Sequence, residues 1–206
     1  MGEDIPHTLP TSLVIATDTF GFADPAVAKA LHPVVMRLAA LIGHSREDLM
    51  APQGLSVWAR AQRTLQPVEA WNTFKDWLDE RNPRFAFSVA RALVAGTVIT
   101  VADQSWAALM RQEARGRMAH LLPEGTILCL PTTPFSAPPI KQRLSALDPA
   151  RDRITCLCAQ GGLAGHPQVS LPGSTVDGLP VGLSIIGPRG SDASLVAVAR
   201  ALEGSA

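Results

Sequence analysis

The sequence carries no net charge and has no long uncharged apolar run. Its 206 residues include eighteen Lys or Arg and eighteen Asp or Glu. Nucleic-acid binders and polybasic membrane-surface proteins need a net cationic face, so this balance argues against both classes. The longest apolar candidate, Ala92 to Ala102, is about half of the roughly 18 residues needed to span a membrane. Because 47% of the residues are apolar, the composition predicts a compact, soluble protein of one domain or at most two small ones.

Cysteine is scarce, and the start of the chain has no secretory character. Cys156 and Cys158 lie too close in sequence to bridge readily, and no second Cys/His pair accompanies them. We therefore expect both to be small helix-packing residues, and we expect no metal site. The stretch from Met1 to Pro6 has neither a basic region nor the apolar core of a secretory signal. A reducing, cytoplasmic location is the expectation.

Complete catalytic motifs are also missing. The sequence has no phosphate-binding loop, no dinucleotide fingerprint, no His-Glu-x-x-His and no Gly-x-Ser-x-Gly. The nearest approaches to a glycine-flanked nucleophile are Ser174 and Ser184, which are better interpreted as part of a strand-ending turn and as an outward-facing strand residue. The only lysines have polar neighbours and are expected to be solvated and protonated: Lys29, Lys75 and Lys141.

Residues 1–122 are predicted to be mainly helical after one strand. The apolar run Leu13 to Ala16 predicts a buried strand. Asp24-Pro25 then predicts a helix start, and apolar spacings carry that helix to Gly43. Further helices are expected at 56–66, 67–80, 84–95 and about 100–122, the last with a capping box at Thr100.

Residues 123–206 are predicted to form a strand-rich portion with a closing helix. The run 126–130 predicts a strand covered on both faces. A helix is expected at 151–160, ended by Gly161-Gly162, and the strands 168–171 and 181–186 are expected to pair antiparallel. A final helix follows Ser191-Asp192. Four strands with seven helices indicate a layered α/β architecture, and so small a sheet indicates that part of it lies elsewhere.

Four motifs in the second portion resemble, in order and spacing, the C-terminal half of amidase signature enzymes. They are Ile127-Leu128-Cys129-Leu130-Pro131-Thr132-Thr133-Pro134 with Ala137-Pro138, the stretch from Thr155 to Pro172, the stretch from Leu179 to Gly187, and Gly190-Ser191-Asp192 with the last helix. Upstream, the strand near Leu13 and the helix around Glu69-Ala70-Trp71 look like the indole-3-acetamide hydrolase branch. The resemblance covers nearly the whole chain.

The resemblance implies a helix-rich α/β/α sandwich with a mixed sheet, of which this chain would be the C-terminal part. The family cleaves amide C–N bonds with water through a serine acyl-enzyme, and it needs no cofactor. A second serine in a cis peptide and a lysine relay the proton. The Gly-Gly-Ser-Ser-Gly-Gly-Ser loop and the lysine precede the region matched here. No residue of this sequence is therefore carried over as nucleophile, bridging serine or base.

What the resemblance does carry over is a pocket wall. The carboxyl end of a strand is a common ligand location in α/β sheets. The expected substrate-binding residues are Thr132, Thr133, Pro134 and Phe135 at that end, with Gly161, Gly162 and Leu163 at the end of the neighbouring helix. Phe135 and Leu163 are expected to shape acyl-group specificity. The alternative is that these prolines and glycines only terminate elements.

Three hypotheses for function remain open. The first is the C-terminal part of an amidohydrolase, inactive alone and active once the missing half is supplied. The second is a non-catalytic amidase-like binding or scaffold module, and the third an independent hydrolase using Ser174 or Ser184. The expected partners are a small amide and either a second copy or the N-terminal half. Exposing roughly 1,000 Å² of apolar surface would cost on the order of 25 kcal/mol, against a typical domain stability of about 5–15 kcal/mol.

Overall fold

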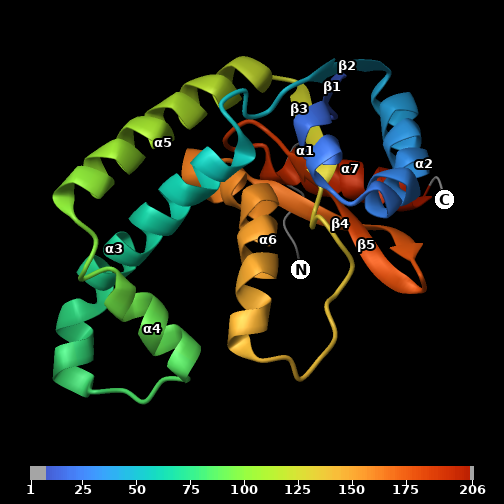
Figure 1. The fold of residues 1–206 in the computed structure, drawn as a ribbon. Helices are drawn as coiled ribbons and strands as arrows, with labels where there is room; N and C mark the ends of the chain where they lie inside the picture. The colour runs from blue at the N-terminus through green and yellow to red at the C-terminus, as the bar shows by residue number, and fades with distance from the viewer. Residues whose placement is uncertain (1–7, 205–206) are drawn as a thin grey trace, which may run out of the picture.

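A mixed sheet of five strands forms the centre of the molecule (Figure 1). The computed structural model describes residues 8–204. The strands are β1 (Ser12–Ala16), β2 (His44–Asp48), β3 (Thr126–Pro131), β4 (Gln168–Val176) and β5 (Leu179–Ile186). The helices are α1 (Thr17–Phe22), α2 (Pro25–Ile42), α3 (Leu55–Arg81), α4 (Phe87–Ala95), α5 (Val101–Leu121), α6 (Leu144–Ala164) and α7 (Asp192–Gly204).

The spatial order of the strands is β2-β1-β3-β5-β4. β1 runs parallel to both β2 and β3, whereas β5 runs antiparallel to β3 and to β4. The β4–β5 hairpin turns at Asp177-Gly178, where both residues have positive φ, as a tight hairpin turn requires. β4 and β2 form the two outer edges of the sheet.

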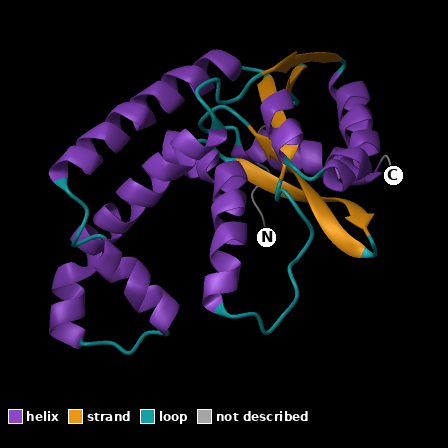
Figure 2. Ribbon diagram, in the orientation of Figure 1, coloured by secondary structure: helices purple, strands orange, loops and turns teal. Residues whose placement is uncertain are grey.

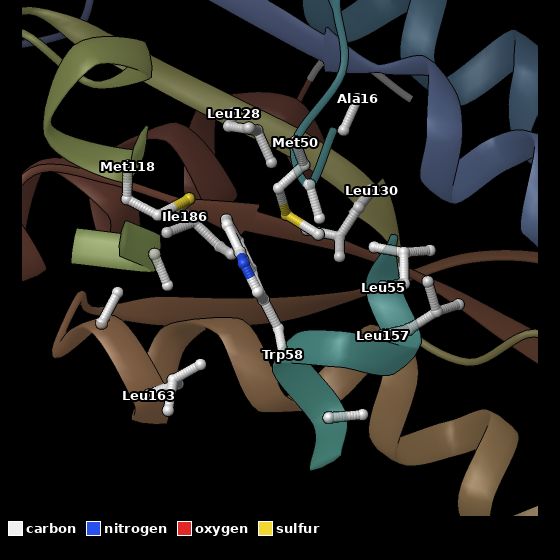
Figure 3. Close-up of a cluster of buried hydrophobic side chains, with 14 of the residues drawn as sticks. Ala16, Met50, Leu55, Trp58, Met118, Leu128, Leu130, Leu157, Leu163 and Ile186 are labelled. Carbon is white, nitrogen blue, oxygen red and sulfur yellow. The ribbon is translucent and has the colours of Figure 1, made fainter. Parts of the chain in front are cut away.

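Helices cover both faces of the sheet, which gives the expected three layers (Figure 2). On one face, Leu13, Ile127 and Ile185 pack in a cluster with side chains of α2 and α7. On the other face, Leu128 and Ile186 pack in a cluster with side chains of α3, α5 and α6, with Trp58 near its middle (Figure 3). The alternation of neighbours such as Ile127 and Leu128 between the two clusters follows from the two-residue period of a strand. Every residue of β3 is buried, which confirms the sequence interpretation.

The elements near the start of the chain differ from expectation in two places. The segments 56–66 and 67–80 form one continuous helix, α3, which passes through Pro67. α1 and β2 are not among the predicted elements: α1 has six residues, and β2 has the polar sequence His-Ser-Arg-Glu-Asp. β2 forms because its backbone pairs with β1 at the edge of the sheet, so its side chains carry no apolar signal.

α6 also differs from the prediction. It begins at Leu144 and continues through Gly161 and Gly162 to Ala164. The left-handed residue that ends it is Gly165, whose amide donates to the carbonyl of Gly161 at 2.7 Å. The expectation that Gly161-Gly162 ends the helix was therefore wrong, by one turn.

α2 begins and ends where the sequence predicts, but it corrects the estimate of the longest apolar segment. Pro25–Ile42 is long and apolar enough to span a membrane by length and composition, and Ala92 to Ala102 is not the longest such run. Its buried side chains pack against the sheet: Val27, Leu31, Val34, Val35, Leu38 and Ile42. α2 is therefore a core helix in this fold. Residues 1–7, where the absence of a secretory signal was inferred, lie outside the described residues.

The part of α3 that follows Val68 forms, with α4, a helical hairpin (the α3–α4 hairpin) that projects from the sandwich (Figure 1). Gly96, just after α4, is buried against the chain at Pro67, and a Cβ there would lie 2.3 Å from the Pro67 carbonyl oxygen. Beyond that contact the hairpin buries little. α4 has no buried residue, and Phe87 is 70% exposed.

Candidate functional site

The predicted site residues Thr132 to Phe135 lie directly after β3, as expected. The backbone amide of Thr132 donates to the carbonyl of Gly182 at 2.8 Å, so the sheet pairing with β5 extends one residue beyond β3. The side chains of Thr132 and Thr133 are half-buried, and Pro134 is buried. This position places the Thr132 hydroxyl beside the polar side chains of Ser170 on β4 and Ser184 on β5.

Four polar side chains form a connected group, here called the hydroxyl network: Thr132, Gln168, Ser170 and Ser184. The Thr132 hydroxyl oxygen lies 2.9 Å from the hydroxyl oxygen of Ser170 and 2.9 Å from that of Ser184. Gln168 donates from Nε2 to the Ser184 oxygen at 3.0 Å. Ser184 is fully buried, whereas Ser170 is exposed. The network therefore runs from the interior to the surface.

Strand alternation explains why these side chains meet. Ser170 and Ser184 are paired across β4 and β5, and Ser184 is also the pairing partner of Leu130 on β3. Gln168 lies two residues before Ser170, and thus on the same face of β4. Two glycines leave room for the network. A Cβ at Gly182 would lie 2.9 Å from the Thr132 hydroxyl oxygen, and one at Gly161 would lie 2.9 Å from Gln168 Oε1.

The loop after Thr132 is fixed to the start of α2 and to α6. The amide of Asp24 donates to the carbonyl of Pro134 at 2.8 Å, and the Thr133 hydroxyl donates to the carbonyl of Phe135 at 2.9 Å. Arg153 of α6 pairs with the Asp24 carboxylate at 2.7 Å and lies 5.2 Å from the Phe135 ring centre. Asp24 occupies the N-cap position of α2, but its side chain makes this ion pair instead of a capping bond.

The second predicted group, Gly161, Gly162 and Leu163, takes three different environments. Gly161 is buried beside Gln168 and thus touches the hydroxyl network. Gly162 is exposed, with Gln62 of α3 as its nearest side chain. Leu163 is fully buried in the core cluster that contains Trp58 (Figure 3). Of the three, only Gly161 shares surroundings with Thr132.

The two serines considered as nucleophiles lack a base. Ser184 is buried and is bonded to Gln168 and Thr132, so the expectation of an outward-facing residue was wrong. Ser174 is half-buried on β4 beyond a bulge and makes no side-chain hydrogen bond within residues 8–204. All three lysines are exposed. Neither serine meets the nucleophile-and-base geometry of a hydrolase.

The three thiols are free and are not poised as nucleophiles. Burial raises the pKa of Cys129 to about 12. Desolvation also raises the pKa of Cys156 and of Cys158. Cys156 is buried, as expected for a packing residue, but Cys158 is exposed on α6, which corrects that expectation. The Cys158 thiol donates to the carbonyl of Thr132 at 3.3 Å, beside the hydroxyl network.

Two cavities lie away from the predicted residues. One of about 730 Å³ lies at the opposite end of β3, between residues 8–11, Gly125 and Arg189. The other, of about 290 Å³, lies between α1 and α2, beside Phe20, His32 and Glu47. Among the residues that the structure describes, no group of three or more His, Cys, Asp or Glu is placed to hold a metal ion.

Sequence reasoning missed Gln168 and Ser170 as site residues. The available signal was their alternation with Val169 and Leu171, which places two polar side chains on one face of a strand whose other face is apolar. That they meet Thr132 depends on β5 lying between β3 and β4, and local sequence does not specify that order.

Comparison with known proteins gives consistent matches. A family model described as Amidase matches residues 13–196. The chain is 28% identical over 162 residues to "Amidase 1" of Oryza sativa subsp. japonica, covering 77% of this chain and 37% of that protein. It is 25% identical over 148 residues to "Amidase 1" of Arabidopsis thaliana, covering 72% of this chain and 35% of that protein. A glutamyl-tRNA(Gln) amidotransferase component of Thermus thermophilus is 32% identical over 124 residues, covering 58% of this chain and 26% of that one.

Solved structures share the fold. A crystal structure of an amidase superposes with a TM-score of 0.75 at 25% identity, covering 98% of this chain and 47% of that one. A bacterial aryl acylamidase of the amidase signature family, 17% identical, superposes with a TM-score of 0.73 over 97% of this chain and 44% of that one. The chain thus spans less than half the length of these proteins. Because the family model matches from β1 into α7, the chain belongs to the amidase family.

Proposed function

We propose that this chain forms the C-terminal half of a domain that hydrolyses amide C–N bonds, and that it supplies one wall of the acyl pocket. In this proposal the serine nucleophile, the bridging serine and the lysine come from a segment outside residues 1–206. Water then releases the acyl group as a carboxylate, after ammonia or an amine has left. The observation that carries the proposal is the hydroxyl network at the carboxyl end of β3, within a chain of the amidase family.

The polarity of the network supports a ligand-facing role. Polar groups are expensive to bury and are commonly retained where they orient a ligand. Here three hydroxyls and one amide follow one another toward an exposed strand edge instead of ending in the core. Leu163 points into the core, so among the predicted wall residues we assign the acyl contact to Phe135. Thr132 orients the neighbouring hydroxyls, and Gly161 leaves space for the Gln168 side chain.

Uncovered surface supports the need for a second segment. β4 is the outer strand of the sheet, and within the described residues no strand pairs with its free edge. An unpaired edge of nine residues is a site for further strand addition. The α3–α4 hairpin also leaves Phe74, Trp77 and Phe87 exposed. We propose that the segment which brings the nucleophile covers some of this surface.

A scaffold that keeps the fold without the chemistry is the alternative. It predicts binding of a partner and no hydrolysis in any mixture. An independent hydrolase is disfavoured by the surroundings of Ser174 and Ser184, which include no lysine or histidine hydrogen-bonded to either hydroxyl in the part of the chain that the structure describes.

The experiment is hydrolysis in trans. Indole-3-acetamide and a series of small aliphatic amides are incubated with the chain alone and with the N-terminal half of an amidase-family relative. Ammonia release is measured, and complex formation is followed by size-exclusion chromatography with light scattering. Ser174→Ala and Thr132→Val serve as a matched pair, because Ser174 lies outside the network.

Activity only in the mixture is expected, with Ser174→Ala unaffected and Thr132→Val weakened. A stable complex without hydrolysis would favour the scaffold. Hydrolysis by the chain alone that Ser174→Ala abolishes would overturn the proposal in favour of an independent hydrolase.

A further inference from the structure

The surroundings of Ser184 set the direction of its hydrogen bond to Thr132. Its hydroxyl oxygen accepts from Gln168 Nε2, and among residues 8–204 its own hydrogen has one hydrogen-bonded acceptor, the Thr132 oxygen. Ser184 is fully buried, so water cannot serve as an alternative partner. A buried hydroxyl hydrogen without an acceptor is strongly disfavoured. Ser184 therefore donates to Thr132.

The same reasoning passes outward along the network. Once the Thr132 oxygen accepts from Ser184, its hydrogen is free for the second hydroxyl at 2.9 Å, that of Ser170. Ser170 then accepts from Thr132, and its own hydrogen has no acceptor in the network. Because Ser170 is exposed, that hydrogen points away from the three groups behind it and toward the open face of β4. Starting from Gln168, each group thus donates to the next, and the last free donor is the Ser170 hydroxyl.

We infer that Ser170 is a hydrogen-bond donor to the carbonyl oxygen of an amide ligand, and that Gln168, Ser184 and Thr132 are positioning residues that hold it in the donor state. This inference deepens the proposed function, on which it rests, by naming the ligand contact. An amide carbonyl is the matching ligand chemistry because it accepts hydrogen bonds in the plane of its oxygen lone pairs. A donor fixed before binding costs less to order than a freely rotating hydroxyl.

Two glycines support this interpretation. A side chain at Gly182 would press on the Thr132 oxygen from the β5 backbone, and one at Gly161 would press on Gln168 Oε1 from α6. The hydroxyl network therefore needs a residue without Cβ beside Gln168, at its inner end, and another beside Thr132. The Cys158 thiol adds a third contact, because it donates to the Thr132 carbonyl and helps to fix that residue's backbone.

The sharpest test reverses the direction of the hydrogen bonds in the hydroxyl network without deleting a hydroxyl. In Gln168→Glu, an ionised carboxylate has no hydrogen to give and accepts from Ser184 instead. Ser184 then accepts from Thr132, and Thr132 from Ser170, so the Ser170 hydrogen turns inward. Protonating the introduced carboxyl restores a donor at this position and thus the original direction. A directional role predicts this recovery at low pH.

The first readout is ligand binding by the 206-residue chain. Acetamide and indole-3-acetamide are titrated while backbone amide resonances are followed by NMR. We expect shifts centred on Ser170 and Leu171, weakened about tenfold in affinity in Ser170→Ala, as loss of one hydrogen bond implies. Gln168→Glu should match Ser170→Ala at pH 7.5 and approach the wild type near pH 4.5, while Ser170→Thr, which keeps the donor, should bind normally.

Ionisable groups near the network call for controls. His166 lies two residues before Gln168, the Cys158 thiol donates to the Thr132 carbonyl, and Arg153 lies over Phe135 and pairs with Asp24. The wild type and Ser174→Ala are therefore titrated over the same pH range, and thermal unfolding of each variant is recorded. A pH response common to all proteins belongs to groups that they share, such as His166 or the Asp24 carboxylate, and not to the hydroxyl network.

The second readout separates this inference from the proposed function. In the mixture with an N-terminal half, Ser170→Ala should raise KM about tenfold with a smaller effect on kcat. Binding shifts at Ser170 without hydrolysis in any mixture would leave the inference standing and remove the proposed function. Hydrolysis with no shift at β4, and with Gln168→Glu behaving as the wild type at every pH, would overturn the inference while leaving the proposed function intact.

Discussion

The sandwich and the α3–α4 hairpin both carry large aromatic side chains, but these side chains are buried in the sandwich and largely exposed in the hairpin. In the sandwich, Trp58 is fully buried and its indole N–H donates to Glu113 at 2.7 Å. Farther along the same helix, Trp77 is 45% exposed and has only Phe74 and Phe85 as ring neighbours within the described residues. α3 thus begins in the buried core and ends with apolar side chains on the surface. The difference indicates where a second segment would add stability and where none is needed.

The largest expected effect comes from the two tryptophans of α3. Trp58→Ala removes a fully buried ring and leaves the Glu113 carboxylate without its donor, so the free energy of unfolding should fall by about 3–5 kcal/mol. Trp77→Ala should change it far less. Urea denaturation of both variants checks the pair. Equal losses would show that the hairpin is as well packed as the sandwich.

A second pair compares two glycines. Gly182→Ala places a methyl group 2.9 Å from the Thr132 hydroxyl oxygen and 3.1 Å from the Leu171 carbonyl, and it should cost about 1–3 kcal/mol of stability. Gly116→Ala lies within α5 with open space around it, and it should stabilise by up to about 1 kcal/mol. Thermal unfolding distinguishes the two signs. A neutral Gly182→Ala would mean that the hydroxyl network is loosely packed.

A third prediction concerns the uncovered hairpin. Phe87→Ser removes an apolar side chain from α4, where no residue is buried, so the stability of the chain should scarcely change. Self-association should weaken if this surface mediates it, because less apolar area remains to be covered. Sedimentation velocity over a range of concentrations measures the change. Unaltered association would assign self-contact to another surface, such as the β4 edge.

The fourth prediction is a pH dependence carried by His166. Desolvation, with the charge of Arg189, lowers its pKa below 6.5, although its Nδ1 hydrogen bond at 2.9 Å to the Gly187 carbonyl opposes this. The unfolded chain then binds more protons than the folded chain just below neutrality. The histidine therefore contributes no pH dependence above about pH 7.5, and stability falls as pH drops through 6.5 toward the folded pKa.

His166→Gln should flatten that part of the stability curve measured by urea denaturation between pH 5 and 8. His120→Gln on α5 is a matched control, because that side chain is exposed. An unchanged slope in His166→Gln would contradict the assignment.

The smallest expected effect is on thiol chemistry. Desolvation raises the Cys158 pKa, so iodoacetamide should modify this exposed thiol slowly at pH 7 and faster as the pH rises above 9. Cys129 should remain unmodified until the protein unfolds. Mass spectrometry after timed alkylation checks both. Rapid modification of Cys158 at pH 7 would show an activated thiol beside Thr132.

Much of the architecture was predictable because the apolar periodicity was strong. The continuous run in β3 predicts a strand buried on both faces, and the Thr100–Asp103 capping box predicts the start of α5, where the Thr100 hydroxyl accepts from the Asp103 amide. β2 was not predicted because an edge strand can form by backbone pairing alone, while its side chains are polar and give no apolar signal. The end of α6 was misplaced because glycine can lie within a last helical turn as well as after it.

The site was only partly predictable, for a related reason. Thr132 follows a strand directly, so its position at the sheet's end could be inferred from local sequence. Gln168 and Ser170 become its neighbours only through the order β3-β5-β4, which is a long-range property. Leu163 was expected at the pocket because of its place near Gly161, but helical periodicity turns it into the core.

The most direct test of the proposed function is ammonia release from indole-3-acetamide and small aliphatic amides by the chain mixed with an amidase-family N-terminal half. We predict no release by either part alone, release by the complex, and a lower rate with Thr132→Val. Release by the chain alone would contradict the proposal, because the nucleophile would then lie within these 206 residues.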